Sequence, residues 1–485
     1  MSLDLRLLVG SDANRDHLET ALRIEQRRLV LRTMLTEGRT AAKVGYAMLH
    51  SVPGTAPYSK SCVVKYLPPG RDSETEVARH RAAVEVEERF RPRLSRLLDG
   101  RAPIVLADRG ILMFYADAGN RTALSLLGSD GLIELCRAVA GGVLDTWNPG
   151  IGFDPESVSS LLLRMLNGRL NPGRPLHTWL AGRPELSAGN QWTTVAGGAR
   201  MINPHALATG GFDPLDVSTL TGRTHGDLHL SNIVLHRQWS EHATDNYQLI
   251  DLGGFEPEAP IARDPAHLVL SVVAHHLPDL GDGARIALAE ALVDPAGRTR
   301  LPAEIRAVAR VMSEAGHDRA DRDGRADDWQ QQWLLGYVAG GLTFAGRDMP
   351  GDGARQWYFE LAAHAATAFL KLVGKLPLEP PKRIPQPRDG TADPTTVVSR
   401  SLSETLGTSE RGTWNRLFNA LGPASLPGDG VDKHVPVAPA EVEAFVAWCA
   451  EQDRWQRLIE ELAKMRYGAE PLNRLQAAIV AAFGR

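Results

Sequence analysis

The stretch THGDLHLSNIVLH, residues 224–236, places two histidines, an aspartate and an asparagine within its first nine positions. His225 and His229 are four positions apart, a spacing at which two imidazoles on a helix can share a zinc ion. However, Gly226 follows the first histidine and the run NIVL follows soon after the second, which indicates a loop that leads into a strand. The sequence shows no third ligand near this pair, so a zinc site is disfavoured.

Two expected strands carry metal-binding oxygens at their ends. The strand NIVL begins with Asn232, and the strand YQLI (247–250) is followed by Asp251. A hairpin of these strands would bring the two side chains together, and their oxygens are ligands that Mg²⁺ takes along with water and phosphate. Asp227 would lie at the mouth of the same site, where it can orient or deprotonate an attacking hydroxyl. Such a trio suits phosphoryl transfer, which depends on positioning and charge neutralisation.

HGDLHLSN followed by IDLGG resembles the catalytic loop and metal-binding segment of the aminoglycoside/choline-kinase-like phosphotransferases, relatives of the protein kinases. The resemblance implies that Asp227 is the catalytic aspartate and that Asn232 and Asp251 are metal ligands. It assigns His225 the structural role of bracing the loop. An ordinary polar hairpin remains the alternative interpretation.

The later segment ARDPAHL, residues 262–268, is similar to the acidic segment that packs under the catalytic loop in this family. By this resemblance, Asp264 is structural.

The first part of the chain is rich in apolar, β-favouring runs. We expect strands, separated by Gly, Pro or Asp, at 28–35, 44–52, 61–67, 103–108 and 110–117. A charged helix is expected between the third and fourth strands, at 73–98.

A lysine lies within the third of these runs, SCVVKYL. Lys65 is awkward in a buried strand unless an anionic group meets it, and an exposed edge position is the alternative. In kinases a lysine on the third strand pairs with a glutamate on the next helix. We expect Glu76 to be this partner, with Glu85 as the second candidate, because helical phase alone does not decide between them.

The nucleotide contacts are expected at two further places. The first turn, TEGRTAAK (36–43), has one glycine where protein kinases have three, but backbone amides near Gly38 and Thr40 could hold phosphate. The run MFYADAG (113–119) stands where the family has its inter-lobe hinge. By resemblance, backbone groups from Tyr115 to Asp117 would contact the adenine edge.

These features predict an α+β chain with a bilobal protein-kinase-like fold and a small C-terminal all-α bundle. The expected parts are a β-rich N-lobe at 1–118, a helical C-lobe with the catalytic loop at 119–375, a linker at 376–398 with prolines at six positions, and a helical domain at 399–485.

Composition indicates which kinds of partner and which cellular compartment to expect for this protein. The net charge of −4 argues against nucleic acid as the main partner. The three cysteines are far apart in the chain and suggest a reducing compartment. We see no signal peptide and no apolar run near the roughly 18 residues of a membrane span. We therefore expect a cytoplasmic protein without membrane contact.

The last segment resembles a different class of domain. FVAWCAEQDRWQRLIEELAKMRYG, residues 445–468, has an apolar stripe at helical spacing. It resembles the effector-associated, death-like helical adaptor domains of bacterial conflict and signalling proteins. The resemblance implies that residues 399–485 bind a protein partner with a matching domain. A plain extension of the C-lobe is the alternative.

The sequence thus predicts an ATP- and Mg²⁺-dependent phosphotransferase that acts on a hydroxyl-bearing substrate and is coupled by its tail to a bacterial assembly. The main alternative is a catalytically weak or inactive kinase-like scaffold that binds nucleotide and partner proteins. A third interpretation is a plain antibiotic kinase. The acceptor is not identified by the sequence.

Overall fold

The chain forms two compact units, Met1–Leu376 and Pro377–Arg485, and each is described by itself. The computed structural model describes residues 3–35, 42–85, 88–119, 121–212, 215–294, 301–347 and 352–377 of the chain, followed by 398–403, 417, 442, 445–447, 449, 454–464 and 469–483. The expected phosphate-contacting residues Gly38 and Thr40, and most of the expected linker, lie outside the described residues.

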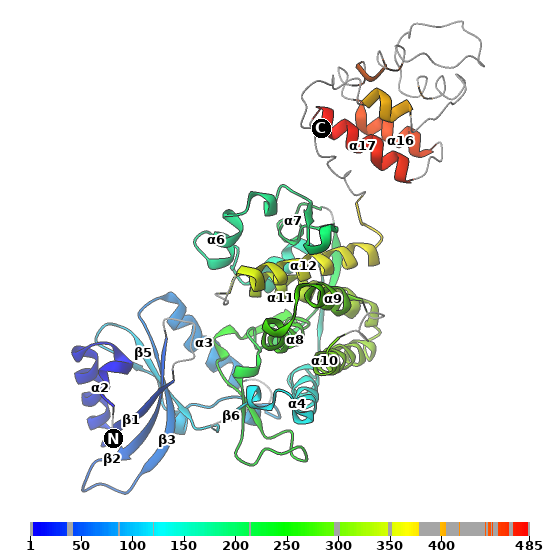
Figure 1. The fold of residues 1–485 in the computed structure, drawn as a ribbon. Helices are drawn as coiled ribbons and strands as arrows, with labels where there is room; N and C mark the ends of the chain where they lie inside the picture. Colours follow the sequence, from blue (N-terminus) through cyan, green and yellow to red (C-terminus); the bar gives the residue numbers. More distant parts are fainter. Residues whose placement is uncertain are drawn as a thin grey trace, which may run out of the picture. The chain divides into compact units, whose positions relative to one another are not determined.

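A five-stranded antiparallel sheet forms the N-lobe of the larger unit (Figure 1). Its order is β1-β2-β3-β5-β4, with bounds Arg27–Leu35 (β1), Lys43–Ser51 (β2), Ser59–Leu67 (β3), Ile104–Val105 (β4) and Ile111–Ala116 (β5). The short helix α1 (Arg6–Val9) precedes α2 (Asp12–Ile24), which packs on the sheet. Leu18 and Leu22 of α2 share a buried core with Leu31, Leu49 and Val64 of the strands.

Strand β3 lies inside this sheet, with β2 and β5 as its neighbours. Lys65 is opposite Val44 on one side and Met113 on the other. The exposed edge position is therefore ruled out for this lysine, whose surface is only 8% exposed.

Helix α3 (Arg71–Glu85) follows β3 but is shorter than the sequence predicted. The expected helix at 73–98 is wrong in its second half, where single helical turns occur at Arg91–Arg93 and Leu98–Gly100. Pro92 lacks the N–H that a continuing helix needs, and Asp99 has a φ of +51°, outside the helical region.

Two small antiparallel sheets support the loops of the C-lobe. In the first, β10 (Asp216–Thr224) lies between β7 (Gly152–Ser157) and β13 (Glu256–Pro260). In the second, β11 (Ile233–Leu235) lies between β6 (Arg121–Thr122) and β12 (Tyr247–Leu249). The expected hairpin is thus present as β11 and β12. A separate pair joins β8 (Trp192–Thr194) and β9 (Arg200–Ile202).

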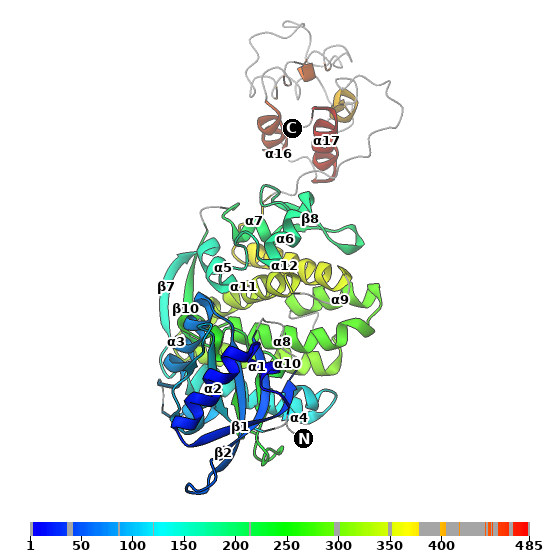
Figure 2. The same cartoon turned by 90° about the vertical axis from the view of Figure 1, so that its left-hand side faces the viewer.

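Helices make up the rest of the C-lobe, and α11 and α12 lie side by side in both views (Figure 1 and Figure 2). The helices are α4 (Asp130–Gly141), α5 (Val158–Leu166), α6 (Pro175–Ala181), α7 (Pro204–Ala208), α8 (Arg263–His276), α9 (Asp282–Val293), α10 (Ala303–Asp321), α11 (Ala326–Ala345) and α12 (Asp352–Leu372). Helix α11 is buried along most of its length and is the centre of the C-lobe core. The predicted α+β class, with a β-rich N-lobe and a helical C-lobe, is confirmed.

The second unit contains α16 (Trp455–Lys464) and α17 (Ala469–Phe483). Trp455, Leu458 and Leu462 form the apolar stripe of α16 and belong to a hydrophobic cluster of this unit alone. Across the described residues, no helix is both long and apolar enough to cross a membrane.

Candidate active site

The loop after β10 is held close to the segment after β12 by backbone contacts. Gly226 has a φ of +80°, and a Cβ at this position would lie 2.0 Å from the carbonyl oxygen of Gly254. Only glycine allows this approach, because any side chain would collide with fixed backbone. The glycine of the HGD motif therefore brings the catalytic loop and the IDLGG segment into contact.

His225 braces the loop from inside. Its Nε2 lies 2.7 Å from the Ile250 carbonyl oxygen, and its Nδ1 accepts a hydrogen bond from the Asp227 N–H at 3.3 Å. In this network Nε2 donates and Nδ1 accepts. Both ring nitrogens are engaged and the side chain is fully buried, so the zinc interpretation of His225 and His229 is excluded.

Asp264, on the first turn of α8, holds the same loop in place through hydrogen bonds. Its carboxylate accepts hydrogen bonds from the N–H groups of His225 at 2.5 Å and Gly226 at 2.9 Å. Burial raises the pKa of this carboxyl, against the effect of these bonds and of nearby basic groups. The expected structural role of Asp264 agrees with this position.

Asn232 lies at the start of β11 and next to the IDLGG segment. Its backbone carbonyl accepts from the Ile250 N–H at 2.9 Å, and Ile233 pairs with Leu249, so Asp251 lies just beyond the paired residues. The Asn232 side-chain Nδ2 donates to the Asp227 carbonyl at 2.9 Å. That bond uses the nitrogen and leaves the Oδ1 oxygen to accept from another group or to bind a cation.

The donor set fits a magnesium ion held partly by a nucleotide. Asp251 is 45% exposed and offers a carboxylate just after β12, the strand that pairs with β11, and Asn232 directly precedes β11. Among the described residues, no three His, Cys, Asp or Glu side chains converge closely enough to hold a metal by themselves. Such a sparse set suits Mg²⁺, which is usually bound by one or two carboxylates together with phosphates and waters.

Lys65 joins the N-lobe to this segment. Its Nζ lies 2.5 Å from Glu76 Oε1 on α3 and 2.8 Å from Asp251 Oδ1. Burial alone would lower the pKa of Lys65, but the charges of Asp251 and Glu76 outweigh it and raise the pKa above its ordinary value. Lys65 therefore stays charged, and of the two glutamates considered, Glu76 is the one in contact.

Asp251 is held in an uncommon backbone conformation. Its φ of +60° lies in the left-handed region, which costs about 1–2 kcal/mol for a residue other than glycine. The next residues lie against α3: a Cβ on Gly253 would be 2.8 Å from the Glu76 side chain, and Arg79 donates to the Gly253 carbonyl at 3.0 Å. These contacts hold the Asp251 carboxylate towards Lys65.

Asp227 is surrounded by basic side chains that the sequence did not indicate. Arg347, just after α11, donates to its Oδ1 at 2.7 Å, and the Nε2 atoms of His267 and His229 are each 3.7 Å from its oxygens. Burial would raise the pKa of Asp227, but these groups together with Arg169 lower it far below the usual range. Asp227 is therefore a stable carboxylate.

The charge that stabilises Asp227 at neutral pH comes from arginine. Arg347 Nη2 lies 2.9 Å from His267 Nε2, a contact in which the imidazole nitrogen can only accept. Burial, with Arg347 beside it, lowers the pKa of His267 well below its ordinary value. Burial likewise lowers the pKa of His229 to about 4. Both rings are neutral near pH 7. They lower the pKa of Asp227 only in acid, where they become protonated.

The expected hinge residues have structural side-chain roles. The Tyr115 hydroxyl reaches the sulfur of Met113 at 3.3 Å inside the N-lobe. The Asp117 carboxylate accepts from the hydroxyls of Tyr46 at 3.3 Å and Ser61 at 3.0 Å. The N–H of Ala116 donates to the Arg96 carbonyl, so it does not face a ligand.

No protein-family model matches the sequence, and no curated protein matches it in sequence. Solved structures that resemble the chain include an aminoglycoside phosphotransferase from Alicyclobacillus acidocaldarius, with 12% identity, a TM-score of 0.35, and coverage of 74% of this chain and 94% of that one. A thermostable mutant of aminoglycoside phosphotransferase APH(4)-Ia has 10% identity, a TM-score of 0.35, and coverage of 71% and 95%. A putative aminoglycoside phosphotransferase from Ralstonia eutropha has 13% identity, a TM-score of 0.38, and coverage of 75% and 99%. At this level of likeness, activity and substrate have to be inferred from the residues of this chain.

The support of the loop by Asp264 can be tested by mutation. Asp264→Ala would leave two buried N–H groups without an acceptor, and we expect a loss of about 2–4 kcal/mol in the free energy of unfolding. Asp264→Asn keeps one acceptor oxygen and should lose less. The measurement is denaturant unfolding of the full chain, with Asp279→Ala, an exposed aspartate, as the control. Equal stability of Asp264→Ala and the control would contradict the supporting role.

Proposed function

We propose that the chain is a phosphotransferase that moves the γ-phosphoryl group of ATP, bound with Mg²⁺, to a hydroxyl acceptor. The observation that carries the proposal is the ion pair between Lys65 of the N-lobe sheet and Asp251 of the C-lobe, 2.8 Å apart. It brings a buried cation and a metal-binding oxygen to one place, beside the loop that bears Asp227 and Asn232. Phosphoryl transfer needs this combination of positive charge, metal ligands and a group that positions the acceptor.

In the proposed reaction, Asp227 orients the acceptor hydroxyl. Its carboxylate accepts a hydrogen bond from the hydroxyl, while the hydroxyl oxygen forms a bond to the γ-phosphorus and the bond from that phosphorus to the β-γ bridging oxygen breaks. Because the pKa of Asp227 is so low, the carboxylate is a weak base. The hydroxyl proton therefore passes to the Asp227 carboxylate late, after the phosphorus–oxygen bond has largely formed, and from there to solvent, while ADP leaves with the electron pair of the broken bond.

The nucleotide is held from both lobes in this proposal. Lys65, kept charged and oriented by Glu76, contacts the α- and β-phosphates, and its present bond to Asp251 loosens when phosphate arrives. Asn232 and Asp251 would hold Mg²⁺, which neutralises charge on the phosphates. Backbone groups of the segment that ends at Asp117 would contact the adenine. Backbone amides near Gly38 and Thr40, in the first turn, would contact the phosphates.

The rival function is a nucleotide-binding scaffold without phosphoryl transfer. The glycine-poor first turn and the additional C-terminal unit favour this alternative. The full set of Asp227, Asn232 and Asp251 favours the enzyme, because a scaffold needs no residue to position an acceptor.

Transfer of labelled γ-phosphate separates the two. We expect the wild-type protein to transfer or hydrolyse label in the presence of Mg²⁺ and a mixture of metabolites and proteins. Asp251→Ala should lose at least a hundredfold in rate because it removes a metal ligand, and Asp227→Asn should lose a similar factor while still binding ATP. The control is Asp279→Asn, because Asp279 is exposed and is not one of the proposed site residues. If wild type and Asp227→Asn bind Mg·ATP equally and neither turns it over, the scaffold alternative is correct.

We also propose that residues 399–485 connect the phosphotransferase to a partner protein in a bacterial signalling or conflict assembly in the cytoplasm. Support comes from the separate hydrophobic cluster of this unit and from α16, in which one face is buried and the other carries Gln456, Glu460 and Lys464. An independent core allows a unit to fold and bind without changing the catalytic part.

Deletion of residues 399–485 tests this connection. The shortened protein should keep Mg·ATP turnover within about twofold and lose co-purification with a helical-bundle partner that the full chain retains in bacterial cells. Mass spectrometry identifies the partner, and thermal unfolding checks that the shortened chain is folded. A plain antibiotic kinase would instead give the same aminoglycoside resistance with and without the tail.

A further inference from the structure

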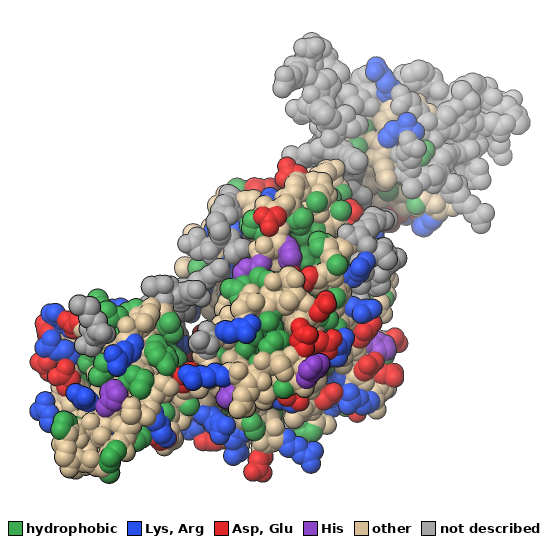
Figure 3. Space-filling view, turned by 60° about the horizontal axis from the view of Figure 1, so that its bottom comes forward, with side chains coloured by type: hydrophobic (Ala, Val, Ile, Leu, Met, Phe, Trp, Pro, Cys, Tyr) green, Lys and Arg blue, Asp and Glu red, His purple; other side chains and the backbone are tan. Residues whose placement is uncertain are grey.

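Three arginines from different parts of the C-lobe lie near one another, and one of them, Arg347, contacts Asp227. Arg169 follows α5, Arg263 begins α8, and Arg347 follows α11. Arg263, Arg347 and Asp227 are each close enough to affect the pKa of Arg169. By contrast, basic and acidic side chains are intermixed on the outer face in Figure 3. The concentration of arginine is a property of the site.

Two of these arginines are already paired with carboxylates. Arg263 donates to Glu256 at 2.7 Å, and Arg347 donates to Asp227 at 2.7 Å. The hydrogen bond of Arg169 goes to a backbone carbonyl, that of Leu166, at 3.1 Å. Across the part of the chain that the structure describes, no carboxylate forms an ion pair with Arg169.

The other ionisable groups nearby do not contact the Arg169 guanidinium. Asp264 is committed to two backbone N–H groups of the loop. His229 and His267 are neutral near pH 7, since burial lowers the pKa of both. Burial, together with Arg263 and Arg347, lowers the pKa of Arg169 to about 10, which leaves it charged at neutral pH. Asp227, Glu256 and Asp264 balance the formal charge of the three arginines, but the Arg169 guanidinium itself has no carboxylate in contact among the described residues.

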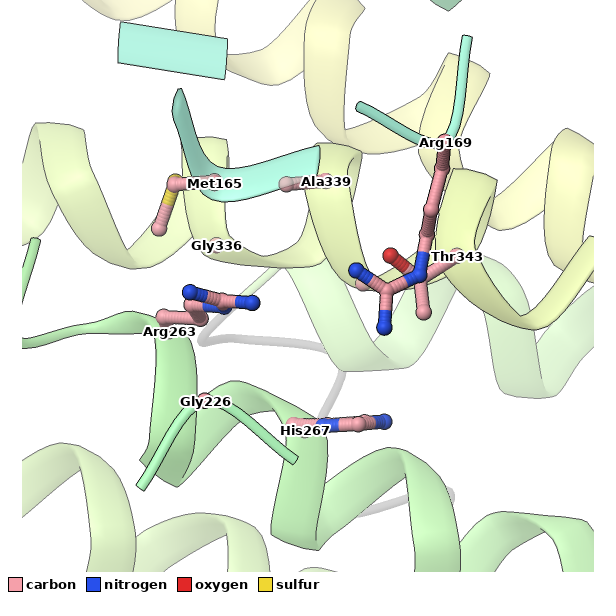
Figure 4. Close-up of a pocket in the computed structure, with 9 residues that line it drawn as sticks. Met165, Arg169, Gly226, Arg263, His267, Gly336, Ala339 and Thr343 are labelled. Carbon is pink, nitrogen blue, oxygen red and sulfur yellow. The ribbon is translucent and has the colours of Figure 1, made fainter. Parts of the chain in front are cut away.

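Arg169 faces a small cavity that adjoins the catalytic loop. In Figure 4 its guanidinium points into the space between Thr343 and His267. Gly226, the neighbour of Asp227, lines the same space, which measures about 250 Å³ with the solvent that it opens to. The enclosed part of this space is no larger than one water molecule, so one oxygen of a ligand would enter it and the rest of the ligand would lie in the part that opens to solvent.

We propose that the acceptor of the phosphoryl group is an anionic hydroxyl compound, whose carboxylate or phosphate group binds Arg169 while its hydroxyl meets Asp227. This inference rests on the proposed function and names its substrate class. The guanidinium fork matches the oxygens of either anion, and in a partly buried site such a pair is strong. A polycationic aminoglycoside would be repelled by the same arginine.

Binding of inorganic phosphate tests the anion site without any turnover. We expect calorimetric titration to show phosphate binding to the wild-type full chain and at least tenfold weaker binding to Arg169→Met. Arg169→Lys keeps the charge but loses the fork, so it should fall between the two. The control Arg137→Met removes an arginine that is half exposed on α4 and should bind like wild type. Titration with acetate shows whether carboxylate is accepted as well as phosphate. Thermal unfolding checks that each variant is folded.

Acceptor preference is then measured with labelled ATP and four small compounds: glycerol 3-phosphate, glycerate, glycerol and kanamycin. The anionic pair should be phosphorylated at least tenfold more efficiently than the other two. Arg169→Met should raise the KM of the anionic acceptor at least tenfold with the KM of ATP unchanged. The inference is overturned if glycerol or kanamycin is used as well as the anionic acceptors. It is also overturned if the wild-type protein does not bind phosphate, or if Arg169→Met binds phosphate as tightly as wild type. If phosphate binding depends on Arg169 but no label leaves ATP, the anion site stands and the proposed function fails.

Discussion

The buried ammonium of Lys65 is the group around which the two lobes are organised. A charged amine inside a central strand is costly unless anions surround it, and here Glu76 and Asp251 supply them from α3 and from the C-lobe. Removing either carboxylate would leave the buried ammonium with one anion in place of two. The cost of burying Lys65 therefore ties α3 and the segment of Asp251 to the N-lobe, and it places an exposed carboxylate oxygen where a metal–phosphate group would be bound.

A second constraint acts on the loop of Asp227, in which nearly every polar contact is used for support. Asp264 accepts from two backbone N–H groups, His225 links the loop to Ile250, and the Asn232 nitrogen donates to the Asp227 carbonyl. Each of these side chains is buried, so the loop has little freedom to move. The groups left over for a ligand are the Asn232 oxygen and the carboxylates at 227 and 251. This division between supporting and ligand-facing atoms lets a few residues form a preorganised site.

Much of this arrangement followed from the sequence because its signals are local. HGDLHLSN ends where β11 begins and IDLGG follows β12, the partner of β11 in one hairpin, so the spacing brought Asn232 next to Ile250, the neighbour of Asp251. The apolar run around Lys65 indicated a buried strand, and that burial required an anion nearby. The α+β class followed from the change of pattern along the chain. In contrast, the helix expected at 73–98 ends at Glu85, and Pro92 lacks the N–H that a helix continuing through the second half of this range would need. The arginines around Asp227 could not be found in this way, because Arg169 and Arg347 come from segments far from the loop in sequence and carry no local motif.

Dependence of ATP affinity on Mg²⁺ tests the central claim most directly, since it reports on the convergence of Lys65, Asn232 and Asp251 without requiring an acceptor. Calorimetric titration of the full chain with ATP should show binding that becomes at least tenfold tighter when Mg²⁺ is added. Asp251→Asn should abolish that gain, because the carboxylate that shares the cation is lost, whereas Asp279→Asn should keep it. Binding of ATP that is indifferent to Mg²⁺ in the wild-type protein, or a gain that survives in Asp251→Asn, would contradict the account.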